Sequence, residues 1–171
     1  MFLAVEQLQE ESIRFDEVFA PGHIDYEIED LSQADGLRVQ GVASLLDTEI
    51  HVRGRLGTEV KLVCARCLEP VRQVVDREFD LFYHPIADVP GEDELHVPRG
   101  EEELGFYQGE GLLLEDVAKE QVILALPMRT LCREDCQGLC PQCGRNRNRE
   151  SCGCAVQTGD PRWEVLKKIM K

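Results

Sequence analysis

The stretch that decides the fold is Cys64-Ala-Arg-Cys67-Leu68-Glu69-Pro70, a pair of cysteines that lies between two runs of alternating residues. Apolar side chains recur at intervals of two or four residues along residues 50–62 before the pair and along residues 71–83 after it. This period is typical of strands that bury one face. We therefore predict a β-hairpin that carries the two cysteines at its tip.

Two further segments complete the predicted fold. Residues 37–45 alternate in the same way, so three successive strands predict an antiparallel β-meander, or a partly closed sheet, over residues 37–84. Residues 112–126 place apolar side chains on one helical face, and Pro127 ends that helix. The face consists of Leu114, Val117, Ala118, Val122, Ala125 and Leu126. The sequence therefore predicts an α+β fold in which one main helix covers the sheet.

The chain divides into a body and a tail. We assign residues 1–127 to a β-rich body and residues 128–171 to a cysteine-rich tail. Within the body, residues 85–111 are rich in Pro, Gly and Glu, which is typical of a solvated acidic loop. Near the end of the tail, Asp160-Pro161 is a helix start. A short apolar stripe follows it, formed by Trp163, Leu166 and Met170. We expect the tail to end in a short helix.

Length and composition indicate one folded domain of ordinary size. The 171 residues are 43% hydrophobic and 30% charged, which is typical of globular rather than disordered proteins. No apolar run approaches the ~20 residues of a membrane span. The apolar start, residues 1–5, has no basic segment before it and is followed by glutamates, so we expect no signal peptide and a cytoplasmic protein.

The charge is unevenly distributed. The net charge of −14 argues against indiscriminate binding to nucleic acid. Residues 1–36 carry one basic and ten acidic side chains, and residues 78–127 carry two basic and thirteen acidic ones. Residues 37–77 and 128–171 are mildly basic, with seven against five and nine against five. All eight cysteines lie in these two basic segments.

The spacing of the cysteines indicates metal binding. They form four close pairs: Cys64/Cys67, Cys132/Cys136, Cys140/Cys143 and Cys152/Cys154. Eight thiolates in four pairs suit two tetrahedral zinc ions, each with four sulfur ligands. Disulfides are disfavoured in a reducing cytosol, and the tail has too few apolar residues to bury six cysteines as hydrophobes. A thioredoxin-like redox pair is disfavoured as well, because the first pair lies between strands and not at a helix start.

Spacing alone leaves two ways to share the ions. The preferred partition joins the first two pairs on one zinc and the last two pairs on the other. The rival partition joins the two CxxC pairs, as in a zinc ribbon. In both, metal connects the hairpin to the tail, and four thiolates leave no open coordination position, so the sites would be structural.

Two sets of basic side chains are candidates for RNA contact. One alternates with asparagines between the last two cysteine pairs: Arg145, Arg147 and Arg149. Guanidinium groups in this arrangement can contact phosphates and base edges. The other set lies on the solvent side of the predicted sheet: Arg53, Arg55 and Lys61. Acidic side chains share that face, which favours an ordinary solvated surface over a dedicated binding surface.

These residues together resemble a known family. The shared motifs are Cys64–Pro70, Glu120–Pro127, Gly138–Gly144 with the flanking cysteines, and Asp160–Trp163. In this pattern the second half of the chain resembles the bacterial YceD-like proteins, also called large ribosomal RNA subunit accumulation proteins. The family usually has leucine between the two asparagines of the tail, where this chain has Arg147.

The resemblance implies a non-enzymatic role in the production or stability of large-subunit (23S) ribosomal RNA. The expected partners are that RNA, a basic protein of the assembling large subunit, or both, and neither a membrane nor a small-molecule substrate. Two alternatives stay open: a metal-dependent RNA-processing hydrolase, and a zinc module that acts through protein contacts alone. The sequence contains no HExxH, G-x-S-x-G or P-loop motif that would favour an enzyme.

Overall fold

The computed structural model describes residues 1–86 and 104–154, and all structural statements below concern these residues. The predicted final helix after Asp160 and most of the predicted acidic loop lie outside them. The elements, in chain order, are β1 (Phe2–Ala4), α1 (Val5–Glu10), β2 (Ile13–Phe19), β3 (Ser32–Gln33), β4 (Leu37–Leu46), β5 (Glu49–Val63), β6 (Pro70–Pro85), β7 (Leu104–Tyr107), β8 (Gly111–Leu113) and α2 (Leu114–Ala125). The described chain is thus mostly sheet with few helices.

The predicted meander is confirmed as the centre of the main sheet. Strands β4, β5 and β6 follow one another in sequence and pair antiparallel. The β5–β6 hairpin is the longest unit, with its register running from Ile50 opposite Tyr83 to Val63 opposite Pro70. The hairpin tip therefore lies where the sequence predicted it, at residues 64–69.

The edges of the sheet differ from the prediction. The strand order is β2-β4-β5-β6-β7, with β3 paired to β5, which is an open order in the described residues and not a partly closed sheet. Strand β7 pairs parallel to β6, so the sheet is not purely antiparallel. The sequence predicted a loop over residues 85–111 and a helix from residue 112. This was wrong in two places: residues 104–107 form β7, and residues 111–113 form β8. Four- and three-residue strands are too short to show a readable alternation.

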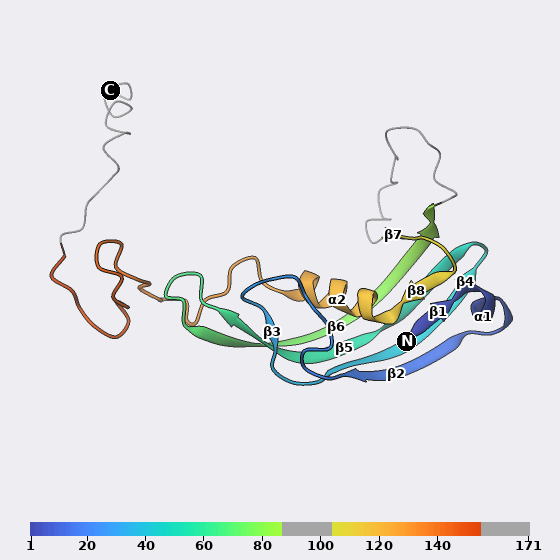
Figure 1. Cartoon of the computed structure of the whole chain (residues 1–171), viewed down its shortest axis with the longest axis horizontal. Helices are drawn as coiled ribbons and strands as arrows, with labels where there is room; N and C mark the ends of the chain where they lie inside the picture. The colour runs from blue at the N-terminus through green and yellow to red at the C-terminus, as the bar shows by residue number, and fades with distance from the viewer. Residues whose placement is uncertain (87–103, 155–171) are drawn as a thin grey trace, which may run out of the picture.

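The core lies between the inner face of the sheet and α2. Figure 1 shows α2 along one face of the curved sheet, beside β5 and β6. Its buried side chains include Leu114, Val117 and Val122, which lie in one apolar cluster with Val52 and Leu56 of β5. The stripe that defines the helix in the sequence is thus the stripe that the helix buries.

Two glycines let the central strands approach each other closely. Gly41 of β4 lies opposite Gly54 of β5. A Cβ at Gly41 would lie 2.3 Å from the carbonyl oxygen of Arg53, and one at Gly54 would lie 2.4 Å from that of Gln40. Both distances are too short for any side chain, so only glycine fits at this crossing.

Candidate metal centres

The first cysteine pair is held by the tip of the β5–β6 hairpin. The backbone N–H of Cys64 donates to the carbonyl of Glu69 at 2.8 Å, and the N–H of Leu68 donates to the carbonyl of Cys64 at 2.9 Å. This tight turn brings the sulfurs of Cys64 and Cys67 into one cluster, in which both cysteines are buried. It also places Leu68 at a φ of 59°, a left-handed conformation that is costly for a residue with a Cβ.

The tail is bound to this hairpin tip through its backbone. Ala65 N–H donates to Thr130 at 2.9 Å, and Leu139 N–H donates to Arg66 at 3.0 Å. The Arg66 guanidinium donates to the carbonyl of Cys136 at 2.7 Å. Figure 1 shows the tail segment at the end of the hairpin, beyond the sheet. These bonds hold the second cysteine pair beside the first, although the two pairs are more than 60 residues apart in the sequence.

The first cluster therefore contains Cys64, Cys67, Cys132 and Cys136. Their four sulfurs lie within 4.8 Å of one another. The Sγ–Sγ distance is 3.8 Å from Cys64 to Cys136 and 3.6 Å from Cys67 to Cys132. A tetrahedral zinc ion with Zn–S bonds of about 2.3 Å has sulfur–sulfur edges of about 3.8 Å. The donor set and its spacing thus fit a divalent ion of this size.

The pKa values of the thiols in the first cluster also favour the binding of a cation. Burial opposes ionisation of Cys64, but backbone amides, first that of Arg66, lower its pKa to about 6. Burial likewise opposes ionisation of Cys136, yet the Asn148 amide, which lies 3.2 Å from its sulfur, lowers its pKa. Desolvation and the neighbouring Cys136 sulfur raise the pKa of Cys132 to about 12. Without a cation, Cys64 and Cys136 therefore ionise more readily than an ordinary cysteine, whereas Cys132 resists ionisation.

The second cluster is local. It contains Cys140, Cys143, Cys152 and Cys154, again with all four sulfurs within 4.8 Å. The Gly144 N–H donates to the carbonyl of Cys140 at 2.8 Å, and Gly144 has a φ of 72°. Backbone amides of the knuckle lower the pKa of Cys140 to about 6, whereas the Cys143 sulfur and burial raise the pKa of Cys154 to about 12. The structure thus groups the cysteines as the preferred partition does, and not as the rival one.

Two asparagines connect the clusters, a role that the sequence analysis missed. The Asn148 carbonyl oxygen accepts hydrogen bonds from Arg133 and from the backbone N–H of Gln137. Asn146 donates to the Glu69 carboxylate at 3.0 Å. Both asparagines are half-buried, whereas the arginines that alternate with them are exposed. The alternation itself was the available signal, because it separates an inward from an outward side of the loop.

The arginines of the tail differ in how free their charge is. Arg149 forms an ion pair with Glu69 at 2.8 Å, and Arg145 lies 3.7 Å from Glu150. Arg147 is exposed and has no ion pair within the described residues. The leucine position of the family pattern therefore carries a solvent-facing cation here. Of the three, Arg147 is the side chain most available to an anionic partner.

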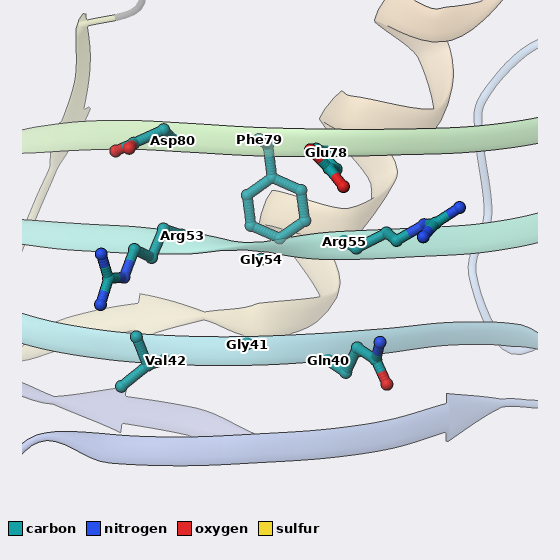
Figure 2. A pocket seen from close by; sticks show the side chains of 9 residues that line it. All are labelled: Gln40, Gly41, Val42, Arg53, Gly54, Arg55, Glu78, Phe79 and Asp80. Atoms are coloured by element: carbon teal, nitrogen blue, oxygen red, sulfur yellow. The ribbon is translucent and has the colours of Figure 1, made fainter.

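The second set of basic candidates lies on the outer face of the sheet, away from α2. Figure 2 shows Arg53 and Arg55 beside Glu78 and Asp80, around a shallow groove of about 870 Å³. Arg55 forms a two-bond ion pair with Asp76, at 2.6 and 2.5 Å. Charges of both signs thus share this face, as in the solvated-surface interpretation. The structure does not gather these residues into one basic surface.

Lys61 lies apart from the other two candidates, near the hairpin tip. Its cross-strand neighbour is Arg72, which pairs with Glu59 at 2.5 Å.

Among the described residues, no helix is both long enough and apolar enough to cross a bilayer.

Comparisons with known proteins cover the part of the chain that contains all eight cysteines of the clusters. A model of the family described as large ribosomal RNA subunit accumulation protein YceD matches residues 52–170. A Haemophilus influenzae protein of that name is 32% identical over 79 residues, which cover 46% of this chain and 43% of that protein. Uncharacterised proteins of Mycobacterium bovis and Mycobacterium tuberculosis are 32% identical over 156 residues, which cover 91% of this chain and 72% of theirs. No solved structure matches the chain.

Proposed function

The chain belongs to the YceD family of large ribosomal RNA subunit accumulation proteins, and from that premise we propose that it is a non-enzymatic factor in ribosome biogenesis. In this role it supports the synthesis, processing or stability of large-subunit ribosomal RNA. The observation that carries the proposal is the extent of the family match, because residues 52–170 include most of the long hairpin and both cysteine clusters. The proposal places the protein in the cytoplasm, with assembling large subunits.

The two clusters serve this function as structural zinc sites. When bound, each ion supplies a tetrahedral crosslink between four thiolates. Cys64 and Cys67 would hold it from the hairpin, and Cys132 and Cys136 from the tail, while the backbone amides and Asn148 orient and stabilise the thiolates. Four protein ligands leave no coordination position for water or substrate, which supports a structural over a hydrolytic role.

We further propose that contact with ribosomal RNA is small and positioned, and is centred on Arg147. This side chain is exposed and unpaired in the described chain, whereas Arg145 and Arg149 have carboxylate partners. A zinc ion together with its four thiolates carries a formal charge of −2, which limits the general attraction of the tail for phosphate. The acidic remainder of the chain would meet a basic protein of the same particle instead.

The direct test is to replace the gene by variants and to measure the ratio of large- to small-subunit ribosomal RNA. We expect the ratio to fall in a null strain, to be restored by the wild-type chain, and to stay low with Cys64→Ser/Cys67→Ser. The chain should also co-purify with large-subunit ribosomal RNA after a salt wash. An unchanged ratio in the null strain, together with no co-purifying ribosomal RNA or protein, would reject the proposal.

Further measurements on the same proteins and strains separate the alternative functions. A hydrolase would accumulate unprocessed RNA ends and would require an ion with three protein ligands and a water, which metal spectroscopy distinguishes from four sulfurs. A module that acts through proteins alone would keep its co-purifying proteins after ribonuclease treatment. An RNA-binding factor would lose large-subunit RNA with Arg147→Ala but not with Arg14→Ala, which removes an exposed cation on β2, outside the tail.

A further inference from the structure

A groove of about 390 Å³ lies far from both cysteine clusters, between β7, β8 and the first turns of α2. Figure 1 shows these elements toward the end of the sheet opposite the tail. Buried Tyr83 of β6 and Val117 of α2 contribute to its lining. The volume lies within the range of pockets that hold small ligands or single side chains.

The walls of the groove are apolar and unusually exposed. Phe2 of β1, Phe106 of β7 and Leu113 of β8 line it, and 46%, 41% and 45% of their respective surfaces are exposed. Single exposed hydrophobic residues are ordinary in soluble proteins. Three of them from separate strands around one cavity form a patch, which is typical of a binding site.

The charge of the groove has one sign. Among the described residues, its only ionisable lining groups besides tyrosines are Asp116 and Glu120, which lie one helical turn apart on α2. Neither forms an ion pair within the described part of the chain. The Tyr83 hydroxyl lies 3.5 Å from Glu120, and burial, followed by the charges of Glu120 and Asp116, raises the pKa of Tyr83. No lysine, arginine or histidine of residues 1–86 and 104–154 lines the groove.

Aromatic walls beside two carboxylates that lack an ion-pair partner in the described chain suit one kind of group. The aliphatic stem of a lysine or arginine can lie on Phe2, Phe106 and Leu113 while its cation meets a ring face and the carboxylates. A phosphate would be repelled, which disfavours RNA as the occupant. We propose that this groove binds a lysine or arginine side chain from a basic, partly apolar segment of another polypeptide.

The inference rests on the proposed function for the source of that segment, a basic protein of the assembling large subunit. It assigns the two ends of the molecule to different partners, with the tail directed to RNA and the groove to protein. The acidic charge of residues 78–127, with thirteen acidic and two basic side chains, would also attract such a partner before contact.

The test uses the full metal-loaded chain and a labelled synthetic peptide of alternating lysine and leucine, with fluorescence anisotropy as the readout. We expect Asp116→Asn/Glu120→Gln to weaken binding at least about tenfold. The matched control is Glu78→Gln/Glu134→Gln, which changes the net charge equally at exposed positions outside the groove. The control should bind within about twofold of wild type at moderate salt. Equal weakening by both variants would overturn the inference, since it would mean charge attraction without a site.

A second variant tests the apolar walls. Phe106→Ala removes an exposed ring, so we expect an unchanged melting temperature and weaker peptide binding, by about fivefold. No effect on binding would overturn the inference, as would a concentration-dependent dimer that Phe106→Ala abolishes, because a second copy would then fill the groove. If the peptide does not bind but the chain still supports large-subunit RNA, only this inference fails. If the peptide binds and RNA levels do not depend on the chain, only the proposed function fails.

Discussion

The two cysteine clusters have the same donors but different positions in the chain. The first joins cysteines that are more than 60 residues apart, and three of its four members are buried. The second closes within residues 140–154, and only Cys140 is buried. A crosslink that closes a longer loop removes more freedom from the unfolded chain. The first cluster should therefore hold the molecule together, and the second should order only a surface loop.

The largest expected effect is that of Cys136→Ser. It should remove one metal ion and release the tail from the hairpin, because Leu131 and Leu139 of the described tail pack against the cysteines of this same cluster. We expect the melting temperature to fall and limited proteolysis to cut throughout residues 128–154. The loss should amount to several kcal/mol, since structural zinc sites contribute on the order of 10 kcal/mol of apparent binding free energy.

Cys140→Ser is the matched change in the second cluster. It should also remove one metal ion, but cleavage should be confined to residues 138–154 and the melting temperature of the body should change little. Backbone bonds from Ala65 to Thr130 remain in place in this variant. Identical cleavage patterns for Cys140→Ser and Cys136→Ser would contradict the view that the first cluster holds the tail to the hairpin while the second orders only a surface loop.

Asn148→Ala should come next in size. The amide nitrogen of Asn148 lies 3.2 Å from the Cys136 sulfur, and its oxygen accepts two further bonds. Loss of such an outer partner typically lowers metal affinity by about 10- to 100-fold. A chelator competition assay should detect this at the first cluster, whereas exposed Gln142→Ala should leave the affinity unchanged.

Metal binding should release fewer protons from the first cluster than its four thiols carry. Cys64, with a pKa of about 6, is already a thiolate at neutral pH, and the pKa of Cys136 is lowered as well. Calorimetry in buffers of different ionisation enthalpy measures the released protons. Release of all four protons at neutral pH from Cys140→Ser protein, in which only the first cluster binds, would contradict these protonation states.

The smallest expected effect concerns the residue that follows each CxxC pair. Leu68 and Gly144 both have positive φ, at 59° and 72°, but only Gly144 lacks a Cβ. Leu68 is also 62% exposed, so its side chain gains little from burial. Leu68→Gly should thus stabilise the chain by up to about 1 kcal/mol, and Gly144→Ala should destabilise it by a similar amount. Denaturant unfolding of the metal-loaded chain measures both, and opposite signs would contradict the assigned turn conformations.

Sequence reasoning succeeded where a physical constraint repeats along the chain. The alternation over residues 50–62 and 71–83 predicted the hairpin, and paired cysteines predicted two groups of four sulfurs. It failed where the constraint is tertiary. Strand β7 forms only because β6 offers an edge to Leu104–Tyr107, and the four residues carry no pattern of their own. The roles of Asn146 and Asn148 depend on which cysteines and carboxylates lie beside them, which spacing alone does not show.

We expect bound metal to hold the hairpin and the tail together, and the difference between the two clusters depends on this crosslink. Native mass spectrometry of the purified chain, with cysteine alkylation followed in the same sample, tests it directly. We predict two zinc ions per chain, one in either cluster variant, and protection of all eight thiols until a chelator is added. A metal-free chain that keeps its protease-resistant tail while its thiols react freely would contradict the account.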